Sequence, residues 1–223
     1  MPFVFLILLM ICGYFAARTI ARWRTRRHLL ASTLSAHQRA LARAAVPLLG
    51  KMPREMQARY EGKVRLFLHQ VNFIGCDGLE VTEEMRLSIA AQACLLVANT
   101  NAWYKTLRTI LIYPGAFKSM RAERSGFVVT ERDQVRLGES WARGPVVLSW
   151  AHSDAGAQTP DDGHNVVIHE FAHQLDTLSG ETDGAPILAR EQSFATWARV
   201  FIAAYDRHVA NVSGGRATVL DSY

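Results

Sequence analysis

The feature that most constrains this chain is the stretch Asn165-Val-Val-Ile-His169-Glu170-Phe-Ala-His173-Gln-Leu-Asp176. It contains H-E-x-x-H, a pattern that binds zinc in metallopeptidases. On a helix, residues four apart share a face, so His169 and His173 can direct two imidazoles at one ion. Glu170 sits about 100° round the helix, where a general base for a zinc-bound water belongs. Asp176 returns to the histidine face and is predicted to orient a histidine by accepting its other N–H.

The residues around this pattern favour a helix anchored in a core. Ile168, Phe171, Ala172 and Leu175 are predicted to form its buried, apolar side. The alternative is a pair of surface histidines beside a surface glutamate, which these apolar neighbours do not favour.

A catalytic zinc site of this kind needs a third protein ligand. A metzincin would place a histidine or aspartate six residues after the second histidine, and Ser179 stands there, which excludes that class. By spacing, Glu191 is the best candidate in the chain, and Glu181 and Asp183 are weaker ones. The residues alone leave the third ligand open.

The N-terminal segment, residues 2–21, is predicted to span a membrane. Residues 2–17 carry no charge, and Arg18 can extend its side chain to the interface. Arginines follow this apolar run rather than precede it, unlike in a cleavable signal peptide. The positive-inside rule then predicts a cytoplasmic protein anchored to the inner membrane, N-terminus out and C-terminus in. A wrongly assigned start or a buried core helix are the alternatives.

Charged residues are distributed unevenly along the 223-residue chain. The net charge is +5, but residues 18–66 hold twelve Lys and Arg against two acids. Because this excess directly follows the apolar segment, a membrane explains it better than a nucleic acid, and no direct nucleic-acid partner is expected. Cys12, Cys76 and Cys94 form no C-x-x-C pair, so neither a disulfide framework nor a thiolate zinc site is indicated.

The rest of the chain predicts an α+β fold that is mainly helical with a small β-sheet. Helices are expected over 31–50, from Pro53, from an N-cap at Thr82, from Asn165 to about Gly180, and over 189–209. Short β-branched runs predict strands at 109–113, 127–130 and 146–150. Residues 151–163 are predicted to be a polar loop. The sequence therefore predicts two regions: an anchor with its basic flank at 1–30, and a metallopeptidase domain at 31–223.

Several motifs in order resemble the Mlc titration factor A family, zinc metallopeptidases of bacteria. The resemblance covers about residues 35–223 and implies a zincin-like fold similar to the catalytic domain of anthrax lethal factor. The motifs are residues 81–96, 110–117, 138–141, 144–150, 165–176, 183–186 and 220–223.

The resemblance implies roles for particular residues. His169 and His173 match the zinc ligands and Glu170 the base. The family takes its third ligand from a glutamate in an Asn-Pro-x-Glu-Phe-Phe segment that follows a Leu-Asp-x-Tyr element. Residues 220–223 match that element, so the chain is expected to lack the C-terminal helix carrying the third ligand. Tyr223 matches an active-site tyrosine that would donate to the developing oxyanion, although a frayed terminal residue is the alternative.

The leading functional hypothesis is a Zn²⁺-dependent metallopeptidase with aminopeptidase-type activity on short peptides. A second hypothesis is a regulatory protein that sequesters an Mlc-like transcriptional repressor, since the family is named for that property. A third is a catalytically inactive fragment with an incomplete metal site.

Overall fold

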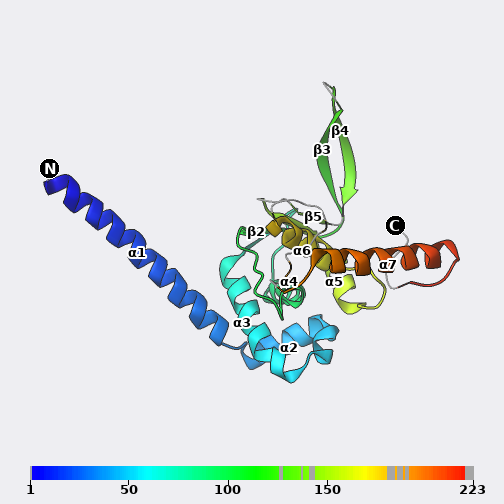
Figure 1. Cartoon of the computed structure of the whole chain (residues 1–223), viewed down its shortest axis with the longest axis horizontal. Helices are drawn as coiled ribbons and strands as arrows, with labels where there is room; N and C mark the ends of the chain where they lie inside the picture. Colours follow the sequence, from blue (N-terminus) through cyan, green and yellow to red (C-terminus); the bar gives the residue numbers. More distant parts are fainter. Residues whose placement is uncertain are drawn as a thin grey trace.

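The computed structural model describes residues 2–125, 128–136, 138–140, 144–179, 184, 188 and 191–218. Within them the chain is mainly helical, in agreement with the predicted α+β class (Figure 1). The helices are α1 (Pro2–Ala31), α2 (Ala36–Ala45), α3 (Arg54–Gln70), α4 (Glu83–Leu95), α5 (Trp150–Gln158), α6 (Val166–Asp176) and α7 (Phe194–Ser213), with 3₁₀ turns at Pro47–Lys51 and Thr177–Ser179. The strands are β1 (Asn72–Gly75), β2 (Thr109–Tyr113), β3 (Phe117–Ser125), β4 (Val128–Arg136), β5 (Gly138–Ser140) and β6 (Val146–Ser149).

The main sheet has the strand order β1-β2-β6-β5. β1, β2 and β6 run parallel, and β5 pairs antiparallel with β6, Glu139 lying opposite Val147. One face of the parallel strands is buried: Ile110 and Ile112 of β2 are fully buried, and so is Leu148 of β6, whereas Ile74 of β1 is 49% exposed on the other face. This order leaves β5 at an edge of the sheet, where it contacts α6.

The helix α6 is held in the core by an aromatic cluster. The Phe171 ring lies 5.5 Å from that of Phe67 on α3 and 5.0 Å from that of Tyr104, measured between centroids. The Tyr104 hydroxyl donates to the carbonyl of Ala93 on α4 at 2.8 Å. α4 lies at the centre, as its apolar sequence predicts, and Thr82 caps it by accepting the Met85 N–H at 3.2 Å.

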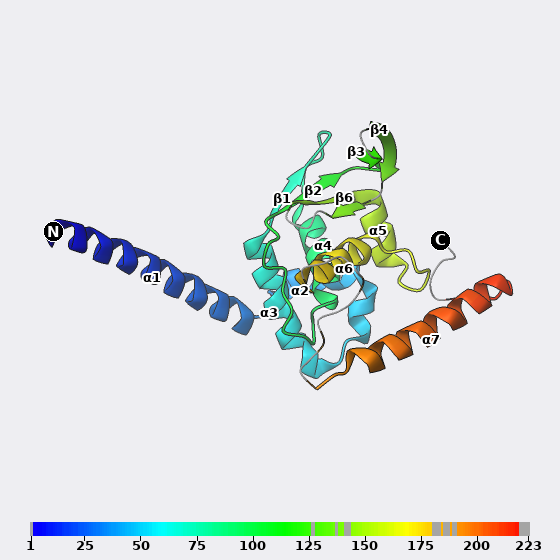
Figure 2. The same cartoon turned by 45° about the horizontal axis from the view of Figure 1, so that its top comes forward.

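The first helix, α1, extends away from the body as one unbroken rod (Figures 1 and 2). Its apolar residues from Phe3 to Phe15 are exposed, and only Leu29 and Leu30 at its far end pack against the core. An 18-residue window of this helix has a mean hydropathy of 2.1 and is 0% buried. α1 is therefore long and apolar enough to cross a membrane, and it is not a core helix of this fold.

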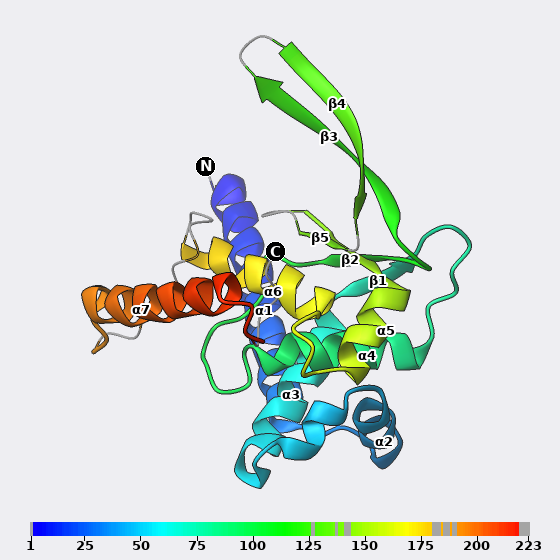
Figure 3. The ribbon, with the colours of Figure 1, turned by 90° about the vertical axis from the view of Figure 1, so that its right-hand side faces the viewer.

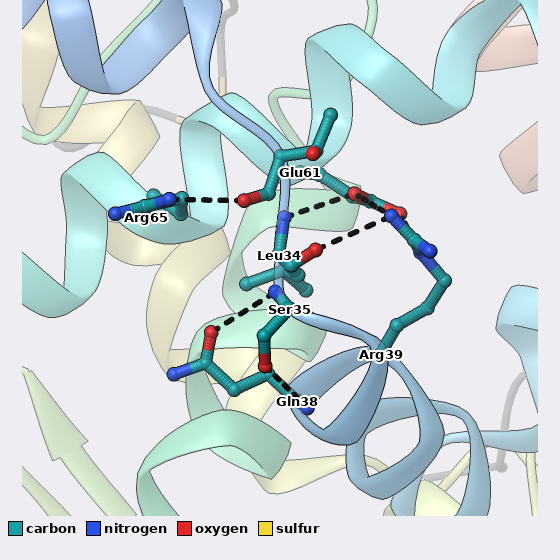
Figure 4. A network of polar contacts seen from close by, with 7 residues as sticks. Leu34, Ser35, Gln38, Arg39, Glu61 and Arg65 are labelled. Carbon is teal, nitrogen blue, oxygen red and sulfur yellow. Dashed lines mark hydrogen bonds and ion pairs between the residues drawn. The ribbon is translucent and has the colours of Figure 1, made fainter.

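The junction between α1 and α2 is fixed by α3 (Figure 4). Glu61 accepts the Leu34 N–H at 3.0 Å and forms an ion pair with Arg39 at 2.6 Å, which lowers the pKa of the carboxyl. Arg65 donates to the Thr33 carbonyl at 3.0 Å. Gly62 meets the backbone of Leu30 so closely that a Cβ there would stand 2.2 Å from the Leu30 oxygen. α1 thus joins the body through a tight contact.

The last described helix, α7, spans Phe194–Ser213, where a helix over 189–209 was predicted. Its apolar side chains Phe194, Phe201 and Tyr205 are 57%, 56% and 62% exposed. The Trp197 ring stacks on Phe194 and Phe201 within the helix itself, at 5.5 and 4.9 Å. The helix forms as predicted, but nothing in the described part of the chain covers its apolar face.

Other parts of the prediction need correction. β2 and the start of β6 lie where expected, and 127–130 overlaps β4, but the predicted loop at 151–163 contains the helix α5. Ser149 caps that helix, and its small residues Ser153, Gly156 and Ala157 are buried. The strands β1, β3 and β5 were also missed; β3 and β4 form a long hairpin that projects from the body (Figure 3).

Candidate functional site

The two histidines of the H-E-x-x-H pattern meet on the open side of α6. Their Nε2 atoms lie 3.2 Å apart, and the rings stand edge to face with centroids 4.7 Å apart. Burial, together with the neighbouring imidazole of His173, lowers the pKa of His169. A neutral ring keeps a nitrogen lone pair, which is what a metal ligand requires.

The spacing of these nitrogens fits zinc. Two imidazoles bound at about 2.0–2.1 Å with a tetrahedral angle place their nitrogens about 3.3–3.4 Å apart. The 3.2 Å between the Nε2 atoms of His169 and His173 is close to that value. The described residues contain no group of three His, Cys, Asp or Glu side chains that would hold a metal. The described part of the site therefore offers two imidazole nitrogens to a metal.

Glu170 lies on the inner side of α6. It is 6% exposed, and Val167, Phe171 and Gln174 share this buried side. The predicted burial of Phe171 is confirmed, but Ile168 and Leu175 are only half-buried and Ala172 is exposed, so the buried side is centred about 100° of helix rotation from the predicted one. The helix turns its apolar Val167 and Phe171 away from the histidines, and this rotation carries Glu170 into the interior.

The start of α6 is fixed by Asn165. Its Oδ1 accepts the Ile168 N–H at 2.8 Å, which caps the helix. Its Nδ2 donates to Gln92 Oε1 at 2.8 Å and to the Gly156 carbonyl at 2.9 Å. Gln92 is fully buried in α4 and also donates to the Ser153 carbonyl at 3.3 Å. One side chain therefore ties α6 to both α4 and α5.

Replacing Asn165 with alanine is expected to destabilise the chain by about 2–4 kcal/mol, the sum of a lost cap and an unpaired buried acceptor on Gln92. Ser193→Ala is the control, because Ser193 caps the exposed helix α7 and reaches no buried partner in the described residues. It should cost about 1 kcal/mol. Urea unfolding measures both, and equal losses would show that the buried network adds nothing.

The remaining predicted residues do not all converge on the histidines. Asp176 is half-buried and accepts the Gly184 N–H at 2.9 and 3.1 Å, so it shapes the chain after α6. Its predicted role in orienting a histidine stays a prediction. Glu191 is exposed and does not complete a three-residue metal group within the described residues. Glu181, Asp183 and Tyr223 lie outside the described residues.

A large cavity opens beside the two histidines. We call it the histidine cleft; its volume is about 1110 Å³. Its lining includes the α6 residues His169, His173 and Asp176, and residues 99–103 form another part of its wall. The cleft is large enough for a peptide, since ligand pockets usually measure about 300–1,000 Å³.

The helix α3 holds this part of the cleft wall, residues 99–103, in place. Lys63 is buried and donates to the carbonyls of Val97 and Thr100, and Arg59 donates to the Thr100 carbonyl at 2.9 Å. Trp103 Nε1 donates to Gln70 Oε1 at 2.8 Å. Burial lowers the pKa of Lys63, and the nearby guanidinium of Arg59 acts in the same direction.

Sequence reasoning did not identify the residues that support the site. The polar Gln92 within the apolar run of α4 was an available signal that was not used, because a buried amide needs hydrogen-bond partners. Nothing in the sequence around Trp103 distinguished the cleft wall, since its contacts come from α3, more than thirty residues earlier in the chain.

A helix with two imidazoles in this geometry, set in an α+β domain, is typical of metallopeptidases. A family model described as glucose-regulated metallo-peptidase M90 matches residues 20–223, and the chain belongs to this family. The predicted resemblance to the Mlc titration factor A family is confirmed by relatives of that name.

Three relatives illustrate the similarity. An uncharacterised protein of Synechocystis is 38% identical over 204 residues, which cover 90% of this chain and 74% of that protein. Mlc titration factor A of Escherichia coli O7:K1 is 31% identical over 198 residues, covering 85% and 73%. The Klebsiella pneumoniae protein of that name is 31% identical over 185 residues, covering 80% and 68%.

Proposed function

We propose that the chain is a zinc-dependent peptidase in which His169 and His173 hold the metal and Glu170 is the general base. One observation carries this proposal: the Nε2 atoms of the two histidines are spaced at 3.2 Å, as zinc ligands are, beside a peptide-sized cleft. The family membership of the chain supports the same class of enzyme.

In the proposed reaction, the metal and the side chains have separate roles. Zinc, when bound, polarises a carbonyl as a Lewis acid and makes water more acidic. The carboxylate of Glu170 takes the proton of the attacking water and returns it to the nitrogen of the leaving amine. Asp176 is proposed to orient a histidine, and Tyr223 to donate to the developing oxyanion.

The edge strand β5 is the proposed platform for the substrate. It ends the main sheet on one side and contacts α6. An extended peptide can add to such an edge through main-chain hydrogen bonds, which requires no particular side chains. Short peptides cleaved by an aminopeptidase-type reaction are the proposed substrates.

Zinc content tests the metal site. His169→Ala and His173→Ala are each expected to lower the zinc bound per chain at least tenfold, because either change leaves a single described ligand. His208→Ala on the exposed helix α7 is the matched control and should retain the zinc. Metal analysis after dialysis gives the answer. An unchanged chain that holds no zinc would contradict the proposal and favour the inactive-fragment hypothesis.

We propose a second function from the name of the relatives, which describes titration of the protein Mlc. The chain would then bind an Mlc-like transcriptional repressor, and binding would not require peptide hydrolysis. A pull-down with such a repressor should succeed equally for the unchanged chain and for Glu170→Gln. Failure of both would contradict this second function.

The helix α1 is proposed to anchor the protein in the inner membrane with the catalytic domain in the cytoplasm. Its apolar part is exposed, and arginines follow it toward the domain. Residues 2–21 span about 30 Å as a helix, which is the thickness of a bilayer hydrocarbon core, and Arg18 can extend its side chain to the interface.

A further inference from the structure

The end of α1 nearest the domain carries five arginines: Arg18, Arg22, Arg24, Arg26 and Arg27. We call this set the arginine collar. The sequence of α1 contains no acidic residue, and none of the five arginines is paired with a carboxylate in the part of the chain that the structure describes. This charge lies unneutralised along about 14 Å of the helix axis.

The collar surrounds the helix rather than lining one side. With 100° per residue, Arg22 and Arg26 fall on one side, Arg27 lies roughly opposite Arg18, and Arg24 falls between. A helix lying flat on a membrane would have its cations on one face only. A helix that crosses a membrane passes through the headgroup layer and meets headgroups on all sides, which matches the collar.

The aromatic residue within the collar is also placed for the interface. Trp23 is 54% exposed, and the Arg27 guanidinium lies 4.6 Å from its ring centroid. Tryptophan is enriched at the boundary between hydrocarbon and headgroups. Trp23 is 20 residues from Phe3, so the helix reaches this boundary after about 30 Å.

The domain begins immediately after the collar. Leu30 is seven residues beyond Trp23, about 10 Å along the helix, and touches Gly62 of α3. The Arg26 guanidinium lies 5.4 Å from the ring centroid of Trp103, which lines the histidine cleft. Arg59 and Lys63 both donate to the Thr100 carbonyl, three residues before Trp103, so basic side chains lie at this end of the domain as well.

We propose that the arginine collar binds the headgroups of anionic phospholipids and holds the histidine cleft at the bilayer surface. The proposal rests on the insertion of α1 proposed above. Charge complementarity selects the partner: guanidinium groups form charge-assisted hydrogen bonds with phosphate, and an anionic leaflet attracts them further. Peptides at the membrane surface are then the substrates that reach the cleft.

Native mass spectrometry of the full chain tests this proposal. The chain, in detergent micelles, receives equal amounts of phosphatidylglycerol and phosphatidylcholine. Bound phosphatidylglycerol is expected to exceed phosphatidylcholine several-fold. In the triple variant R22Q/R24Q/R27Q the ratio should fall to about one. The control R199Q/R207Q/R216Q removes the same charge from exposed positions near α7 and should keep the preference.

Equal binding of both lipids by the unchanged chain would overturn the proposal. So would a preference that survives in the collar variant, or one that is lost equally in the control. Arg26 is left intact in the variant, so its contact with Trp103 is not disturbed.

A labelling experiment separates this inference from the membrane anchor itself. Cys12 is exposed in the middle of the apolar part of α1. In vesicles of the Cys76→Ser variant, a membrane-impermeant maleimide should label Cys12 only after detergent is added. Protection of Cys12 without a lipid preference would leave the anchor standing and reject the collar. Labelling in intact vesicles would reject both.

Discussion

Glu170→Gln is expected to lower the rate of peptide hydrolysis by about 10²–10⁴-fold while zinc content stays unchanged, because an amide cannot act as general base. Glutamine has nearly the same shape as glutamate, so the buried side of α6, where Glu170 is 6% exposed, keeps its packing. Turnover of a short fluorogenic peptide and metal analysis of the same sample measure the two quantities.

The matched control for this change is Glu191→Gln. Glu191 is exposed and outside any described metal group, so its replacement should alter neither zinc content nor turnover. A loss of zinc in Glu191→Gln would instead identify that residue as the third ligand. Full turnover in Glu170→Gln would remove Glu170 from the mechanism.

Phe171→Ala is expected to destabilise the chain by about 3–5 kcal/mol, the usual cost of removing a fully buried aromatic ring. Phe171 is 0% exposed, and its ring contacts both Phe67 and Tyr104. Such a loss is a large share of the 5–15 kcal/mol by which domains are typically stable. Because Phe171 also follows Glu170, the metal site should lose order together with the fold.

The exposed helix α7 provides the control for that stability change. Phe194→Ala removes the same atoms from a side chain that is 57% exposed, and it should change the free energy of unfolding by less than about 1 kcal/mol. Urea unfolding followed by circular dichroism compares the two. If Phe194→Ala costs as much as Phe171→Ala, the apolar face of α7 is buried in solution.

Local signals explain which elements could be predicted from the sequence. β2 was predicted correctly because Thr109–Tyr113 is β-branched and ends at a Pro-Gly turn. β1 is only four residues long and exists because it pairs with β2, 37 positions later in the chain. The helix α5 was missed because small and polar residues resemble a loop. Its burial against α6 is a tertiary effect that composition does not reveal.

In the candidate site, too, features set by local sequence could be predicted and features set by distant residues could not. The period of the helix was enough to predict that His169 and His173 meet, and their nitrogens are 3.2 Å apart. The rotation of α6 could not be predicted, because it depends on where Phe67 and Tyr104 place the ring of Phe171. The partners of Asn165 and the cleft wall likewise come from distant parts of the chain.

The close contact between Gly62 and the Leu30 backbone has a mechanical consequence for an inserted helix. A transmembrane helix that is too long for its bilayer tilts. If the domain were joined to the helix by a flexible linker, this tilt would not change the orientation of the domain. Here the end of α1 and the residues just after it are held by contacts with Gly62, Glu61 and Arg65 of α3. Any tilt would therefore turn the whole domain, and membrane thickness would decide at what angle the histidine cleft faces the lipid.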